Sequence, residues 1–185
     1  MKFCYLFSVF LLTTSLFAAE HEALEPATPV HAAIEHSGFV PLFVIERNAN
    51  ANIIHYDAKL TDGKLDPHQP VVAYWVMAAE DGRREELNFI EKYKAYGFSI
   101  RPDQKPETFL LTIVSDKKKE IRVFRDGTSV KAEARIGNCD AYLEKVFVAF
   151  NKKSWLINLP DYAEMTGTDV ATGAKCSEKV TPADR

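Results

Sequence analysis

The sequence predicts an all-β domain, most economically an antiparallel up-and-down barrel of about eight or nine strands with one inserted helix. Short runs rich in β-branched and aromatic residues recur at intervals of about ten residues, as in barrels and sandwiches. Asp-Gly pairs such as Asp62-Gly63 and Asp126-Gly127 separate these runs, and such pairs favour the positive φ of tight turns. No repeating strand-helix unit occurs, which argues against a parallel sheet. A β-sandwich is the alternative.

The individual strands follow from these runs. The clearest alternates Val130, Ala132, Ala134 and Ile136 with charged residues, which predicts one buried and one solvated face. The full set of expected strands covers residues 42–45, 53–56, 71–77, 96–101, 109–114, 121–124, 130–136, 142–150 and 155–159.

A helix is expected over residues 83–93. Leu87, Ile90 and Tyr93 recur there at near-helical spacing, with charged residues between them. We therefore expect one face of this helix to lie on the sheet or to cap an open end of the barrel.

Residues 1–19 have the pattern of a signal peptide. Lys2 precedes the apolar run 3–12, and small residues follow at Ala18 and Ala19. We expect export to the periplasm or the extracellular space, with a membrane contact through this leader alone. The alternative is an uncleaved anchor, because the stretch is near the lower limit of a bilayer span. Residues 20–38 then form a flexible lead-in, and residues 39–180 a single β-rich domain.

Cysteine usage agrees with export. Cleavage of the leader removes Cys4 and leaves Cys139 and Cys176, which are expected to form a disulfide in an oxidising compartment. That bridge fastens the C-terminal tail to the body of the domain. The alternative is two unpaired thiols.

Charge and motifs exclude several classes of function. The formal net charge is −3 and the basic residues form no stripe, so a nucleic-acid partner is not expected. The sequence holds no Walker loop, nucleophile elbow, dinucleotide fingerprint or His-Glu-x-x-His motif. No two histidines have the spacing of metal ligands on one element. We therefore predict no catalytic residue, metal or cofactor.

A polar and aromatic cluster is the candidate binding site. Because neighbouring strand residues face opposite ways, only one of Glu46 and Arg47 can project inward. A buried Arg47 needs an acidic partner, which is either Glu86 or a ligand carboxylate or phosphate. The alternative is an ordinary hairpin turn with Arg47 paired to a surface glutamate. The candidate ligand-binding residues are Glu46, Arg47, Asn50, Tyr74, Trp75, Glu86 and Tyr96.

Several segments of the domain carry a family resemblance, namely 43–47, 50–53, 56–57, 63–66, 70–71 with 74–75, 80–87, 95–97 and the later segment 167–173. In these segments the chain resembles an uncharacterised bacterial family, domain of unknown function four-eight-three-three. The resemblance covers most of residues 41–175 and is more specific in its first half. It implies a small exported domain and supplies no activity, substrate or catalytic residue.

We therefore expect an exported, monomeric domain, similar to the calycins in its barrel, that binds a small ligand or an envelope component. One alternative is a hydrolase or transferase that uses Glu46 and Glu86 for proton transfer, which requires their carboxyls to converge in one cleft. The other is a structural or protein-interaction module, which an exposed apolar patch favours.

Overall fold

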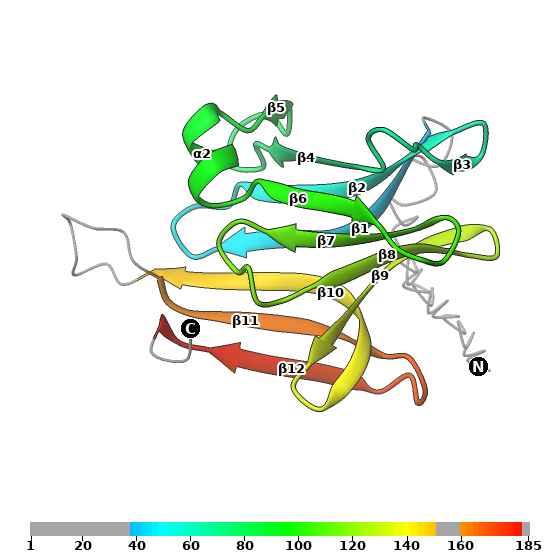
Figure 1. Cartoon of the computed structure of the whole chain (residues 1–185). Coiled ribbons are helices and arrows are strands. Elements are labelled where there is room, and N and C mark those ends of the chain that lie inside the picture. Colours follow the sequence, from blue (N-terminus) through cyan, green and yellow to red (C-terminus); the bar gives the residue numbers. More distant parts are fainter. Residues whose placement is uncertain (1–37, 151–159, 183–185) are drawn as a thin grey trace, which may run out of the picture.

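The computed structural model describes residues 38–150 and 160–182, so the expected leader, the lead-in and the expected strand 155–159 lie outside the described residues. Twelve strands and a short helix make up the described part (Figure 1). Their bounds are β1 (Phe39–Arg47), β2 (Ile53–Thr61), β3 (Lys64–Leu65), β4 (Val71–Val76), β5 (Arg84–Glu86), α2 (Phe89–Lys94), β6 (Phe98–Pro102), β7 (Thr108–Ile113), β8 (Ile121–Asp126), β9 (Ser129–Ile136), β10 (Cys139–Phe150), β11 (Pro160–Asp169) and β12 (Lys175–Val180).

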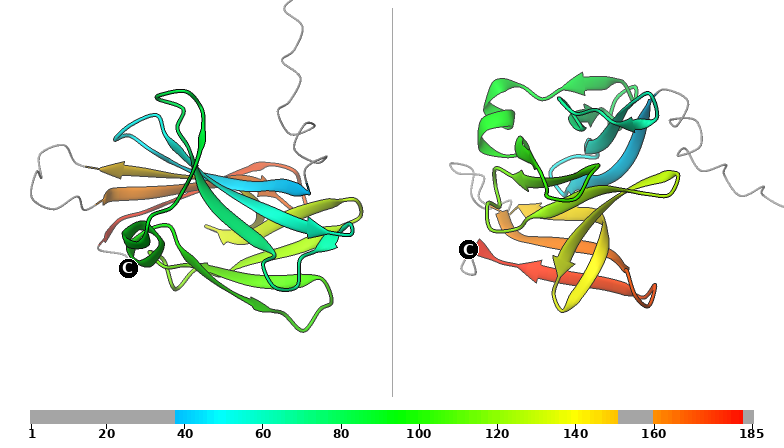
Figure 2. Two further views of the ribbon diagram at one scale, coloured as in Figure 1. Left: turned by 90° about the horizontal axis from the view of Figure 1, so that it is seen from above. Right: turned by 45° about the vertical axis from the view of Figure 1, so that its right-hand side comes forward.

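The strands form one strongly curved sheet, so the predicted all-β class with barrel-like curvature is confirmed. Its main path runs β5-β4-β2-β1-β10-β9-β8-β7-β6, and β11 and β12 branch from β10. Figure 2 shows the curvature from above and after a 45° turn about the vertical axis. Within the described residues no strand pairing joins the two ends of this path, β5 and β6, so the barrel is open there.

One pairing departs from the expected antiparallel pattern. The first residues of β10 pair antiparallel with β9, and Lys145–Val148 of the same edge pair parallel with Val44–Arg47 of β1. The hairpin after β9 fixes the direction of β10, and β10 continues beyond the end of β9 to reach β1. The sheet is therefore mixed, through a long-range contact that no local pattern encodes.

The concave side of the sheet holds the core. Ile54, Tyr56, Leu111 and Val123 are fully buried there, and Phe43 stacks on Tyr56 with ring centroids 4.4 Å apart. The alternation predicted for β9 is confirmed, because its four apolar residues are buried while the charged residues between them are half-buried or exposed.

The predicted helix over 83–93 is wrong in extent and in orientation. Arg84–Glu86 pair with β4 as an edge strand, and α2 begins only at Phe89. Leu87 is buried, but Ile90 and Tyr93 face solvent and α2 has no buried residue. The charged run is thus an edge strand, because backbone pairing with β4 outweighs its helix-like spacing. None of the described helical segments has the length and apolar character needed to cross a bilayer.

The predicted disulfide is present between Cys139 and Cys176. It joins the first residue of β10 to the second residue of β12, with a Cα–Cα distance of 6.5 Å. The expected tail after Tyr162 is itself structured, since β11 pairs along β10 and β12 pairs along β11. The bridge therefore fixes the outer strand of this branch to the main sheet.

Candidate functional site

The candidate site lies where β1 ends, beneath α2. Strand alternation separates the last two residues of β1, as expected. Glu46 points away from the site and pairs with Lys145 of β10 at 3.3 Å. Arg47 points toward Trp75 of β4 and Tyr96, which follows α2. The sheet thus directs a single cation toward the aromatic side chains under the helix.

The Arg47 guanidinium is held by four groups. It lies over the Trp75 ring, with Cζ 4.4 Å from the ring centroid, and Cζ is 5.8 Å from the Tyr96 centroid. Its two terminal nitrogens donate hydrogen bonds to the Tyr96 hydroxyl at 3.2 Å and to the Asn50 side-chain oxygen at 3.0 Å. Stacking and two fixed hydrogen bonds leave this side chain little freedom to reorient.

This cation forms no ion pair with a carboxylate in the described part of the chain. None of the ion pairs between described residues includes Arg47, so the alternative, in which Arg47 pairs with a surface glutamate, is not observed among them. Its Nε is buried and has no hydrogen-bond partner among residues 38–150 and 160–182. A partly buried guanidinium without an ion pair binds an anionic ligand favourably, because no protein carboxylate offsets the free-energy cost of its desolvation.

Glu91 of α2 positions Trp75 and was not among the predicted site residues. Its carboxylate accepts hydrogen bonds from the Trp75 indole at 3.1 Å and from the Asn88 backbone at 2.9 Å. The Asn88 side chain accepts from the Glu91 backbone in return, which completes a capping box at the start of α2. The Asn-x-x-Glu spacing was the sequence signal for this role. Tyr96 meets Trp75 edge-on, with centroids 5.5 Å apart.

Two cavities open beside Arg47, and we call them together the Arg47 cleft. The first has a volume of about 270 Å³ and the second about 420 Å³, and both are lined by Arg47 and Glu91. The other residues that line the first are Asn50, Asn52, Trp75, Met77, Glu85, Glu86 and Asn88. The other residues that line the second are Ala49, Ile90, Lys94, Ala95, Tyr96 and Phe150.

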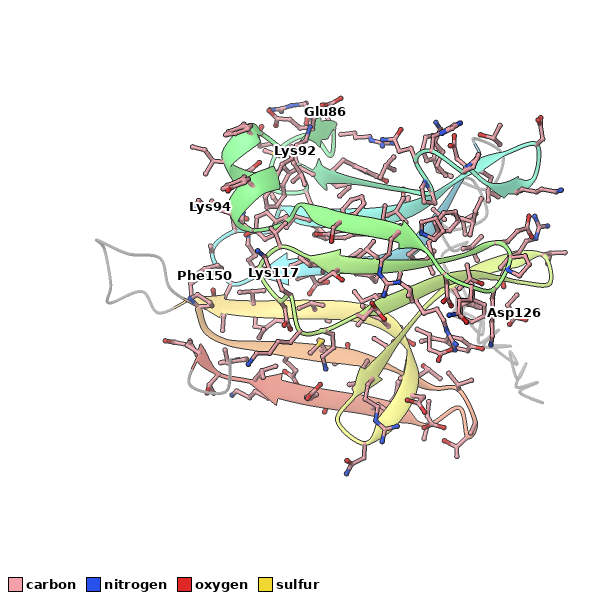
Figure 3. All side chains as sticks on the ribbon, in the orientation of Figure 1. Glu86, Lys92, Lys94, Lys117, Asp126 and Phe150 are labelled. Carbon is pink, nitrogen blue, oxygen red and sulfur yellow. A yellow bond between two sulfur atoms is a disulfide. The ribbon has the colours of Figure 1, made fainter. Side chains whose placement is uncertain are left out.

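The structure thus brings together Arg47, Asn50, Trp75 and Tyr96 from the predicted set. Glu86 lines the Arg47 cleft, but its side chain is 91% exposed and lies 3.4 Å from Lys92 rather than against Arg47. Figure 3 shows Glu86 and Lys92 together beside the helix.

Tyr74 lies outside the Arg47 cleft. Its hydroxyl donates to the buried Asp57 at 2.5 Å, and Arg84 covers its ring with Cζ 3.5 Å from the centroid. Burial, and then the contact with Asp57, raise the pKa of Tyr74 well above its ordinary value. Tyr74 lines a separate cavity of about 640 Å³ at the open side of the barrel, which it shares with Glu86.

The acid-base alternative is not favoured by the geometry. Glu46 and Glu86 pair with lysines on different elements, Lys145 and Lys92. Glu86 lines the Arg47 cleft, and Glu46 is not among the residues that line it.

One group of potential metal ligands gathers among the described residues, namely Cys139, Asp169 and Cys176. Two of its three ligand atoms are the bridged sulfurs, so they offer no thiolate to a metal ion.

Tyr56 supports the site from below. Its hydroxyl donates to the Tyr96 backbone oxygen at 2.5 Å inside the core, and burial raises the pKa of Tyr56 far above its ordinary value.

We expect Tyr56→Phe to lower the free energy of unfolding by about 1.5 kcal/mol, because the Tyr96 carbonyl loses its buried partner. Urea unfolding measures this, with the exposed Tyr93→Phe as the control that leaves stability unchanged. Equal stability of the wild type and Tyr56→Phe would contradict this role.

Comparison with known proteins supports a family assignment. No curated protein and no solved structure gives a significant match to the chain. A family model described as Domain of unknown function (DUF4833) matches residues 43–179, a stretch that runs from β1 into β12 and includes the Arg47 cleft. The chain therefore belongs to the DUF4833 family, as the resemblance in its sequence implied.

Proposed function

We propose that this protein is an exported binding domain that holds a small ligand through a carboxylate or phosphate on Arg47. The observation that carries the proposal is the state of the Arg47 guanidinium. It is stacked on Trp75, fixed by Tyr96 and Asn50, and unpaired with any carboxylate among the described residues.

The chemistry of the cleft suits such a ligand. A guanidinium binds a carboxylate or phosphate through two parallel hydrogen bonds. Each terminal nitrogen of Arg47 donates one hydrogen bond to the residues that the structure describes, so a second N–H on each is available to a ligand as far as these residues show. The adjoining aromatic rings offer apolar surface to the rest of the ligand. Glu85, Glu86 and Glu91 line the first cavity and repel ligands with several negative charges. We therefore expect a monoanionic ligand.

Export is supported by two independent features. The segment 1–19 has signal-peptide composition, and Cys139 and Cys176 form a disulfide of the kind that persists in oxidising compartments. The proposed ligand is accordingly a small molecule of the periplasm or the extracellular space.

Tryptophan fluorescence tests the binding site directly. The chain contains only two tryptophans, so in a Trp155→Phe background the emission comes from Trp75 against Arg47. We expect titration with dimethyl phosphate or acetate, which are both monoanions at neutral pH, to change this emission in a saturable way. Arg47→Lys should weaken binding by about tenfold or more, because lysine keeps the charge but lacks the planar fork.

The matched control is Arg101→Lys, since Arg101 is an exposed arginine already paired with Glu120 at 2.7 Å. This variant should bind with the affinity of its parent. Equal affinities for the parent and Arg47→Lys would refute the assignment of Arg47.

A further inference from the structure

Helix α2 presents apolar side chains to solvent. Phe89, Ile90 and Tyr93 are 81%, 69% and 66% exposed, and the only other exposed large apolar side chain among the described residues is Val170 at 42%. The Phe89 and Tyr93 rings lie parallel, with centroids 6.2 Å apart. In both views of Figure 2 the helix lies at one end of the curved sheet. These three side chains form a continuous apolar face that the described part of the domain leaves uncovered.

The charge on this helix is arranged in a specific way. Its acid, Glu91, is turned toward the domain, where it accepts hydrogen bonds from Trp75 and from the Asn88 backbone. Lys92 and Lys94 remain exposed, and the Lys94 ammonium lies 5.0 Å from the Tyr93 ring centroid. The solvent side of α2 thus combines an apolar face with two cations, of which Lys92 lies 3.4 Å from the exposed Glu86 carboxylate and Lys94 forms no ion pair with a described residue.

A second basic segment lies at the same end of the molecule. The Val114 backbone N–H donates to the Gly97 carbonyl at 2.8 Å, which places the β7–β8 turn next to the residues that follow α2. Lys117 and Lys118 are exposed in that turn. Figure 3 shows Lys117 at the end of the molecule that carries Lys94.

We propose that this end of the domain docks on an anionic phospholipid bilayer. The docking surface consists of Phe89, Ile90, Lys92, Tyr93 and Lys94, flanked by the lysines of the β7–β8 turn. Aromatic and aliphatic side chains enter the headgroup region of a bilayer, and neighbouring lysines are attracted to its negative surface.

Charge selects the bilayer over a second copy of the chain. A twofold contact through α2 would bring together two helix faces that each carry Lys92 and Lys94. Only Lys92 has an acidic partner among the described residues, Glu86, so each face keeps a positive charge and the two faces repel. An anionic lipid surface neutralises all of them. The proposal differs from the expectation of a membrane contact through the leader alone.

The test is co-sedimentation with lipid vesicles. Protein is purified from the secretory compartment of cells that express the full chain. It is mixed with vesicles of phosphatidylcholine, or of phosphatidylcholine with phosphatidylglycerol at low salt. We expect binding to the phosphatidylglycerol vesicles alone. The charge reversals Lys92→Glu and Lys94→Glu together, and Phe89→Ser, Ile90→Ser and Tyr93→Ser together, should each weaken binding by about tenfold or more.

The matched control reverses two exposed lysines, Lys64 of β3 and Lys105 between β6 and β7. In Figure 1, β3 and the β6–β7 connection lie at the end of the sheet opposite α2. This variant should bind as the wild type does. The proposal is overturned if the wild type ignores phosphatidylglycerol vesicles, or if the control weakens binding as much as the α2 charge reversal. It is also overturned if sedimentation equilibrium shows a dimer held by α2, or if the serine variant is less thermostable without lipid, since the chain itself then covers the face.

Discussion

Replacing both bridged cysteines with serine is expected to lower the free energy of unfolding by about 4 kcal/mol, the largest single effect we predict. The bridge closes a sequence separation of 37 residues, and in the chain-entropy model a loop of that length restricts the unfolded chain by about this amount. For a domain of this size the midpoint of thermal unfolding should fall by about 10 °C. Calorimetry of the wild type and the double variant measures both quantities.

Reductant provides the control for this prediction. Dithiothreitol should destabilise the wild type to the level of Cys139→Ser/Cys176→Ser and should leave the double variant unchanged. A double variant as stable as the oxidised wild type would show that pairing of β11 with β10 and β12 fixes this branch without the bridge.

The Gly97→Ala substitution is expected to destabilise the domain by about 3 kcal/mol and to disrupt the Arg47 cleft. A Cβ at Gly97 would overlap the backbone carbonyl of Lys92, which a side-chain rotation cannot relieve. The last turn of α2 must therefore move away from β6. Since Glu91 in that helix holds Trp75, the Arg47 cleft changes shape as well. Urea unfolding and the Trp75 emission in the Trp155→Phe background report the two effects.

Gly63→Ala separates this overlap from the ordinary cost of losing a glycine. Gly63 has a φ of 72°, but a Cβ there meets no atom within 4 Å. It should cost only about 1 kcal/mol, the price of a left-handed backbone for alanine, and should leave Trp75 emission unchanged. If Gly97→Ala and Gly63→Ala lower the free energy of unfolding by similar amounts, α2 can move away from residue 97 without destabilising the domain, and the prediction is wrong.

The sequence predicts those parts of the fold that depend on residues close together in the chain, such as strand alternation and tight turns. The alternation in β9 and the turns at Asp62-Gly63 and Asp126-Gly127 depend on neighbouring residues, and they predicted the all-β class. The parallel pairing of β1 with β10 joins strands about a hundred residues apart, and nothing local specifies it. The edge strand β5 was missed because its charged residues are held by backbone pairing with β4.

The site was predictable to the same degree. Arg47 stood out because a cation at the end of an apolar strand needs an explanation, and the aromatic residues around it come from runs that had to be core strands. The roles of Glu86 and Glu91 were not visible, since they depend on where α2 begins. Because α2 begins after Asn88, the Glu91 carboxylate hydrogen-bonds to Trp75, and Glu86 forms an exposed ion pair with Lys92.

Native mass spectrometry of the protein purified from its own envelope tests the ligand-binding proposal most directly. We expect the wild type to carry a small additional mass that dissociates on collisional activation as an anion. Arg47→Met, purified in the same way, should lack this mass, and Arg101→Met should retain it. The assignment of Arg47 as the residue that binds the ligand would be contradicted by either of two results. One is a wild-type spectrum that shows only the mass of the polypeptide, and the other is the same additional mass on Arg47→Met.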